Sequence, residues 1–191
     1  LNPPSPLTLS PTDLGIKKDE LAKAVKRIKE AIKNQESIIV YGDYDADGVC
    51  ATGIMWETLN SMAAKVMPYI PHRVEEGYGL SEKCIESVKK EYDTKLIITV
   101  DHGITAGEKV EYGKKLGIDF IICDHHVKPE KLPKATAIIH TTQLCGAGVA
   151  WMLAQALKKN DTSLDLAAIA TIADMVPLTG ANRVLVKYGL K

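Results

Sequence analysis

"SIIVYGDYDADG", residues 37–48, joins a run of apolar residues to a turn that carries an acidic side chain at every second position. The apolar run is unbroken over residues 38–40, which is typical of a strand that is covered on both faces. Asp43, Asp45 and Asp47 repel one another at close range unless a cation lies between them. The stretch therefore predicts a buried strand that ends at a cation site.

Similar short runs recur along the chain and alternate with stretches in which apolar residues have helical spacing. The further expected strands are residues 65–70, 95–101, 119–124 and 135–140. The expected helices are residues 17–34, about 51–62, about 82–91 and about 106–116, and the pattern is helical from residue 146 onward. This alternation predicts an α/β fold, with a doubly wound, mainly parallel five-stranded sheet and helices on both faces.

The composition fits a single globular domain over residues 1–191, in which residues 1–15, rich in Pro and Ser, form an extended arm. Lys plus Arg and Asp plus Glu both number 24, so the net charge of zero neither supports nor excludes a nucleic-acid partner. The four cysteines form no C-x-x-C pair, which favours reduced thiols and a cytoplasmic location. The apolar runs are too short to cross a bilayer, so we expect no membrane partner.

Polar residues follow three of the expected strands. Asp101 ends the strand at 95–101, and Asp124, His125 and His126 end the strand at 119–124. The carboxyl ends of parallel strands lie at one edge of a sheet, so these residues are expected to meet the three aspartates of the first turn. So many carboxylates favour Mn²⁺ or Mg²⁺ over a thiolate zinc site, and Cys123 is expected to belong to the core.

These residues also allow interpretations other than a catalytic metal site. A calcium-binding EF-hand loop needs Glu at its twelfth position, which is Ile54 here, and a helix rather than a strand before the loop. A plain strand-to-helix turn with an Asp cap, relieved by Gly48, requires only one aspartate. Taken alone, Asp101 could cap a helix, and the two histidines could be buried hydrogen-bonding residues.

Four ordered segments resemble the successive motifs of the DHH phosphoesterase superfamily. They are "YGDYDADG" (41–48), "TVDHG" (99–103), "CDHH" (123–126) and "TIADMVPLTGANR" (171–183). Two more, "YIPHRVEEGYGLS" (69–81) and "LCGAGVAW" (144–151), are similar to the RecJ-like branch of single-strand-specific exonucleases. The resemblance extends from about residue 10 to the end, and it implies a DHH catalytic domain.

The resemblance also implies two divalent cations, usually Mn²⁺, with Mg²⁺ as the alternative. Such ions can clamp a phosphodiester and lower the pKa of a water molecule, so that no serine or cysteine nucleophile is needed. Asp101 would bridge the ions. Asp43 would either bind an ion or contact the ligands without touching an ion itself. The implied metal ligands are Asp43, Asp45, Asp47, Asp101, His125 and Asp174.

The catalytic set implied in this way consists of the same residues without Asp43 and with His126, which would orient its neighbours or touch the scissile phosphate. Tyr41 stands where many relatives have His, which leaves the ligands of the second ion open. Arg73 is a candidate for phosphate binding, since a guanidinium donates two parallel hydrogen bonds, or else it is a surface residue. Tyr78 would either stack on a base or pack against the protein.

The function implied is metal-dependent phosphodiester hydrolysis, as a 5′→3′ exonuclease on single-stranded DNA that releases mononucleotides in DNA repair and recombination. One alternative is a phosphodiesterase for short oligonucleotides or cyclic dinucleotides, which the neutral charge would suit. Another is a non-catalytic scaffold of the same fold in a replication or repair assembly. The resemblance also implies C-terminal DHHA1-type and oligonucleotide-binding (OB-type) domains, which this chain does not contain.

Overall fold

A five-stranded sheet forms the centre of the molecule in the computed structural model, which describes residues 4–72, 79–159 and 162–191. The strands lie in the order β2-β1-β3-β4-β5, and every neighbouring pair is parallel. They are β1 (Ile38–Tyr41), β2 (Val66–Tyr69), β3 (Leu96–Val100), β4 (Asp119–Asp124) and β5 (Ala137–His140). The predicted α/β class and five-stranded parallel sheet are confirmed.

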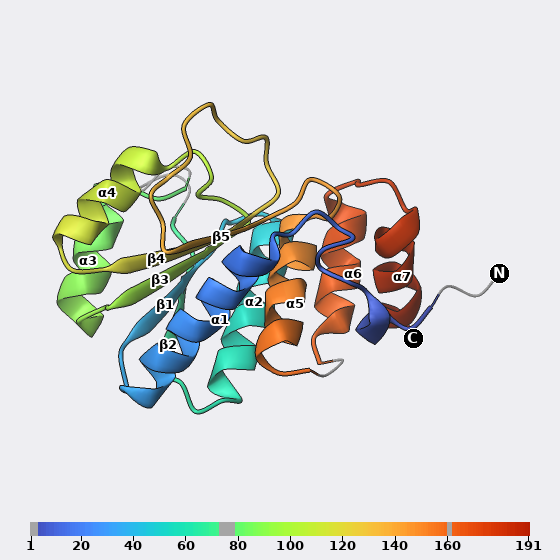
Figure 1. Cartoon of the computed structure of the whole chain (residues 1–191), viewed down its shortest axis with the longest axis horizontal. Helices are drawn as coiled ribbons and strands as arrows, with labels where there is room; N and C mark the ends of the chain where they lie inside the picture. The colour runs from blue at the N-terminus through green and yellow to red at the C-terminus, as the bar shows by residue number, and fades with distance from the viewer. Residues whose placement is uncertain (1–3, 73–78, 160–161) are drawn as a thin grey trace.

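Helices cover both faces of this sheet (Figure 1). The helices are α1 (Lys18–Lys33), α2 (Ala46–Asn60), α3 (Glu82–Tyr92), α4 (Gly107–Lys115), α5 (Gly146–Leu157), α6 (Leu164–Ala173) and α7 (Gly180–Gly189). Helices α1, α2 and α5 pack on one face, with α6 against α2 and α5, and α7 against α6, whereas α3 and α4 pack on the other face.

Alternate residues of each central strand enter the two cores. In β1, Ile38 and Val40 pack with α1, α2 and α5, whereas Ile39 and Tyr41 pack with α3 and α4. All four residues of β1 are buried, as are all five of β3, because each strand has helices above and below it. The unbroken apolar runs in the sequence are explained by this double coverage.

The helical part expected from residue 146 onward consists of α5, α6 and α7. Two local features differ from the sequence-based expectations. Helix α2 begins at Ala46 rather than near residue 51, because Asp45 caps it and the Asp- and Gly-rich turn already forms its first turn. The described part of the arm is not extended: it contains a 3₁₀ turn, η1 (Pro6–Thr8), and it buries Leu14 against the main core.

The strand order reverses between β1 and β3, because the chain passes from β1 to β2 on one side and then to β3 on the other. Ligand sites in open α/β sheets lie at such a switch point, outside the carboxyl ends of the strands. Both β1 and β3 are followed there by predicted site residues. Among the described residues, no helix combines the length and the apolar character needed to cross a membrane.

Candidate active site

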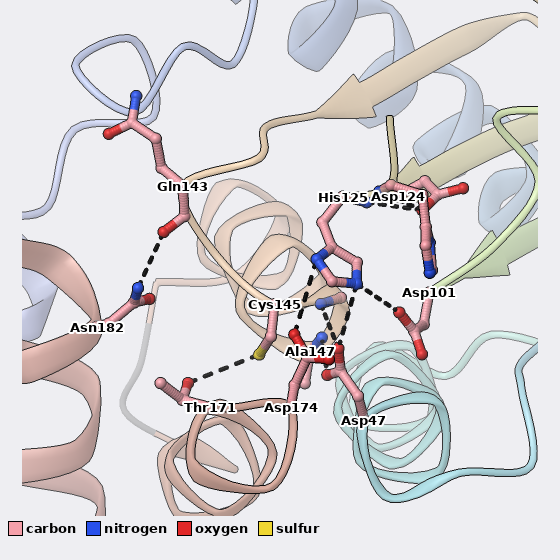
Figure 2. Close-up of polar contacts among 12 residues, drawn as sticks. Asp47, Asp101, Asp124, His125, Gln143, Cys145, Ala147, Thr171, Asp174 and Asn182 are labelled. Atoms are coloured by element: carbon pink, nitrogen blue, oxygen red, sulfur yellow. Dashed lines mark hydrogen bonds and ion pairs between the residues drawn. The ribbon is translucent and has the colours of Figure 1, made fainter. Parts of the chain in front are cut away.

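His125 lies at the centre of three carboxylates that come from three other parts of the chain (Figure 2). Its Nε2 atom is 3.2 Å from Oδ1 of Asp101 and 3.7 Å from Oδ2 of Asp47. On the other side of the ring, Nδ1 is 3.8 Å from Oδ2 of Asp174. The first turn of α2, the end of β3, the end of β4 and the C-terminal end of α6 thus meet at one imidazole ring.

Three overlapping groups of side chains place one ligand atom each within 4.8 Å of one another. They are Asp101 with His125 and His126, Asp47 with His125 and Asp174, and Asp43 with Asp45 and Asp101. Asp101 and His125 each belong to two groups, so the groups are adjacent rather than separate. Carboxylate and imidazole donors in this proportion suit hard divalent cations such as Mn²⁺ or Mg²⁺.

Asp101 carries the clearest sign that a positive charge belongs at this site. Its side chain is almost fully buried, and its Oδ1 atom accepts no hydrogen bond of regular geometry from the part of the chain that the structure describes. Burial raises the pKa of Asp101 to about 7, the nearby charges of Asp47 and Asp45 add to the increase, and His125 opposes it. Burial, together with the same two aspartates, also raises the pKa of Asp174. The protein alone therefore holds these carboxylates in an unfavourable environment.

Asp47 is fixed by helix α5. Its two carboxylate oxygens accept the backbone N–H groups of Gly146, at 2.6 Å, and Ala147, at 2.7 Å. Unpaired N–H groups and the positive end of the helix dipole both favour a carboxylate at this position. A Cβ atom at Gly146 would collide with the carboxylate of Asp101, so the glycine allows the start of α5 to approach the site.

The other aspartates of the first turn have different local roles. Asp45 is exposed and caps α2, with its Oδ1 atom accepting the backbone N–H of Gly48 at 2.9 Å. Asp43 is buried, and a Cβ atom at Gly48 would collide with it. One aspartate therefore has the capping role of a plain turn, as the simpler interpretation requires. Asp43 and Asp47 are buried at the cluster instead, which that interpretation does not explain.

Asp124 was expected at this edge of the sheet but was assigned no role, and the structure shows that it positions the histidines. Its Oδ1 atom accepts the backbone N–H of His126 at 3.0 Å and lies 2.7 Å from Nδ1 of the His126 ring. Its Oδ2 atom accepts the backbone N–H of Ile104 at 2.8 Å. Burial opposes ionisation of Asp124, but these hydrogen bonds outweigh it and lower its pKa to about 2. The position of this aspartate directly before two histidines was the signal that could have identified it.

The two histidines of the third motif differ in exposure and charge. Hydrogen bonding to Asp124 raises the pKa of His126 to about 9, against a smaller opposing effect of burial. The side chain of His126 is half-exposed, so its positive charge is accessible from solvent next to the ligand cluster. Burial disfavours a charge on His125, but Asp101 and Asp47 raise its pKa overall. His126 is therefore a positively charged group of the site near neutral pH.

Other sequence-based interpretations can be compared with the structure. Cys123 is fully buried in the main core, and burial raises the pKa of its thiol, as expected for a core residue rather than a zinc ligand. The hydroxyl of Tyr41 donates to the backbone carbonyl of Gly79 at 3.2 Å, and its ring is buried with α3 and α4. Arg73 and Tyr78 lie outside the described residues.

Asn182 in the fourth motif supports the loop that follows Asp174. Its side-chain amide donates to the backbone carbonyls of Gln143 and Pro177, both at 3.0 Å (Figure 2 shows the bond to Gln143). These bonds join α7 to the segment that leads into α5. The fourth motif therefore contributes one carboxylate, Asp174, and one residue that fixes its surroundings.

A model of the DHH family, N-terminal domain, matches residues 37–176. The chain belongs to the DHH family. This DHH-family chain is 48% identical over 182 residues to the single-stranded-DNA-specific exonuclease RecJ of Bacillus subtilis (strain 168), and the alignment covers 90% of the chain but 23% of that relative.

Two solved structures extend the comparison. A crystal structure of exonuclease RecJ bound to manganese is 36% identical, with a TM-score of 0.85 over 95% of this chain and 49% of that one. RecJ of Thermus thermophilus in complex with Mg²⁺ is 32% identical, with a TM-score of 0.64 over 99% of this chain and 24% of that one. The resemblance inferred from the motifs is confirmed, and the chain spans less than half the length of each of these relatives.

Proposed function

We propose that this chain is the catalytic core of a divalent-metal-dependent phosphodiesterase that removes mononucleotides from the 5′ end of single-stranded DNA. The observation that carries the proposal is the sharing of Asp101 and His125 among three adjacent groups of potential ligands. The similarity to proteins named single-stranded-DNA-specific exonucleases supports the choice of substrate. A role in DNA repair and recombination belongs to the same proposal.

We assign the metal ligands to the residues that converge around His125. Asp101 would bridge two ions, and the remaining ligands would be Asp43, Asp45, Asp47, His125 and Asp174. Divalent cations at this place would supply Lewis acidity toward the phosphate and a water molecule of lowered pKa. The buried carboxylates Asp43, Asp47 and Asp101 hold the ligand set in place on rigid strand ends and helix termini.

His126 would act on the substrate directly. Asp124 binds its Nδ1 edge, so the other ring nitrogen of the cationic imidazole is directed away from this carboxylate and can donate to an oxygen of the scissile phosphate. A charge-assisted hydrogen bond to such an oxygen is stronger than a neutral one, and it favours the charge that develops during hydrolysis. Arg73 and Tyr78 remain proposed contacts of the strand.

The longer relatives support a second part of the proposal. The alignment covers only 23% of the Bacillus subtilis relative, so we propose that the complete protein carries a C-terminal DHHA1-type domain that helps to hold the strand. All four cysteines are free, and this supports a cytoplasmic location for the enzyme.

Two alternatives make different predictions about substrates. A phosphodiesterase for short oligonucleotides or cyclic dinucleotides would suit the net charge of zero, because a short substrate needs few phosphate contacts. A non-catalytic scaffold would have no need to keep potential ligands from all four motifs in one place. The assembled cluster therefore favours an enzyme over a scaffold.

The proposal is tested with labelled substrates. The chain with Mn²⁺ is offered 5′- and 3′-labelled single strands, duplex DNA and a cyclic dinucleotide, and the products are identified. We expect mononucleotides from the 5′ end of the single strand, and no turnover by the Asp101→Asn variant. Asp13 is an exposed carboxylate outside the site, so Asp13→Asn is the matched control and should retain activity. Preferred cleavage of the cyclic dinucleotide would favour the first alternative, and inactivity toward every substrate would favour the second.

A further inference from the structure

A cavity of about 320 Å³ borders the metal-ligand cluster at His126, which belongs to both. Its walls come from the segment before α3, from the loop after β3 and from the end of β4, and they include Leu80, His102, Ile104, Ala106 and His126. The volume is at the small end of the range of ~300–1,000 Å³ that is usual for small-molecule sites. The mechanism proposed above does not use this cavity.

His102 is one of the polar residues that line the cavity, together with Thr105, Lys109, Asp124 and His126. It is 2% exposed, and its Nε2 atom is 3.0 Å from the backbone carbonyl oxygen of Tyr41. A carbonyl oxygen only accepts hydrogen bonds, so Nε2 carries the proton in the neutral ring, and Nδ1 is left as an acceptor.

The Nδ1 atom of His102 is buried and has no hydrogen-bond partner within the described ranges. Gly79 also lines the cavity and lies close to this atom, because a Cβ atom built on that glycine would be 4.0 Å from Nδ1. The hydroxyl of Tyr41 holds Gly79 in place through its carbonyl oxygen. A buried acceptor without a donor is costly, so this cavity suits a ligand that brings an N–H or O–H group to Nδ1.

We propose that the cavity receives the base of the nucleotide whose phosphate lies at the cluster, and that Nδ1 of His102 accepts a hydrogen bond from an N–H of that base. This inference rests on the proposed function. His126 borders both the cluster and the cavity, so the phosphate and base of one nucleotide would lie on its two sides.

The chemistry of the walls fits a base of any identity. Leu80 and Ile104 are buried apolar residues, which suit the flat faces of a heterocycle. Each of the four DNA bases carries at least one N–H donor on its Watson–Crick edge, so a single acceptor can serve all of them. Such a pocket adds affinity for a terminal nucleotide without selecting a sequence.

The test compares three monophosphates that share the phosphate and sugar. The Mn²⁺-loaded chain is titrated calorimetrically with deoxyadenosine 5′-monophosphate, with purine 2′-deoxyriboside 5′-monophosphate, which has no N–H group, and with 2-deoxyribose 5-phosphate. We expect the adenine nucleotide to bind about fivefold more tightly than the donor-free analogue, the factor of one typical hydrogen bond. Both should bind more tightly than the sugar phosphate.

The variant His102→Phe should remove the difference between the two purine nucleotides and leave both tighter than the sugar phosphate. Equal binding of the two purine nucleotides by the wild type would overturn the role of His102, whether or not the variant folds. Equal binding of all three ligands would overturn the base pocket and leave the proposed function intact. If none of them bound, the proposed function would be contradicted, and this inference with it.

Discussion

The carboxylate of Asp47 accepts the backbone N–H of Gly146 at 2.6 Å, across a sequence separation of 99 residues. This bond ties the first turn of α2 to the N-terminus of α5, and Ala147 supplies a second one. Asp47 thus has a structural role that does not depend on any ion. It is also one of the carboxylates that repel one another at the cluster, so removing it has two opposing effects on stability.

The substitution Asp47→Ala should destabilise the metal-free protein. It leaves the buried N–H groups of Gly146 and Ala147 without an acceptor, and each such loss typically costs ~1–3 kcal/mol. We expect the free energy of unfolding to fall by about 2–4 kcal/mol, less any relief of repulsion. Urea denaturation without metal measures the change. The matched variant Asp45→Ala removes only an exposed cap, worth ~1 kcal/mol, and an equal loss in both variants would contradict the special role of Asp47.

Asp101→Asn should have the opposite effect on the metal-free protein. The buried carboxylate lies among other acidic groups, so its neutralisation should leave the fold as stable or make it more stable. The same change should abolish hydrolysis and weaken Mn²⁺ binding, because Asp101 belongs to two of the three ligand groups. Calorimetric titration with Mn²⁺ tests the binding, with Asp13→Asn as control. Unchanged stoichiometry and affinity would remove Asp101 from the site.

Titration of Asp101 should lower the stability of the metal-free protein as the pH rises from about 4 to about 7. Titration of His102 opposes this contribution over the lower part of the range, because burial lowers its pKa to about 4. The pKa of Asp101 is near 3.9 in an unfolded chain and about 7 in the folded protein, so in this interval the folded state binds more protons than the unfolded state. The raised pKa of His126 acts in the same direction at higher pH, between ~6.5 and about 9. Chemical denaturation at a series of pH values measures the slope. Asp101→Asn should remove the contribution of this carboxylate, so the stability of the variant relative to the wild type should rise with pH over this range, and a constant difference would contradict the prediction.

Much of the fold could be predicted because β1, β3 and β4 are apolar on both faces and lie between helices. The parallel topology then brings the residues after these strands to one edge, so the meeting of Asp101 and His125 followed from the strand pattern alone. The pattern from residue 146 onward likewise predicted a helical C-terminal part, which the structure divides into α5, α6 and α7.

Other features depended on tertiary geometry that a linear pattern does not contain. The hydrogen bonds of Asp47 to α5 and of Asp124 to Ile104 join segments that are far apart in the sequence. The burial of His102 and the direction of its free nitrogen arise only when Tyr41 and Gly79 are placed around it. Residue types could therefore identify the ligands of the site, but not the residues that hold them.

The substitution Asp124→Asn should move the alkaline limit of activity to lower pH. Asp124 is the main cause of the raised pKa of His126, so without its charge that pKa should fall toward the ordinary value of ~6.5. If the cationic form of His126 assists hydrolysis, the pH profile of kcat/KM should then decline at a correspondingly lower pH. The variant His126→Gln is the comparison, because it carries no titrating group at this position. If the alkaline limb of the kcat/KM profile lies at the same pH in Asp124→Asn as in the wild type, His126 is excluded as the titrating group.

The chain alone should degrade long single strands slowly and release them after few cuts. The chemistry requires only the edge of the sheet, but gripping a strand requires an extended surface with phosphate contacts and stacking platforms. Within the described ranges, Asp45 and His126 at the cluster are exposed, so water reaches the site and a substrate would be loosely positioned. The alignment covers only 23% of the Bacillus subtilis relative, and the remaining part of that protein is long enough to form a domain that holds the strand.

A single-encounter assay tests this expectation, with an excess of unlabelled trap strand added together with Mn²⁺. The chain alone should release a few nucleotides per encounter, whereas a version extended by the C-terminal part of the Bacillus subtilis relative should release many more. An extension in which the added part is denatured by substitution of its core serves as the control for length alone. If the unextended chain digested long strands to mononucleotides in the presence of the trap, the grip on the strand would have to come from this domain itself.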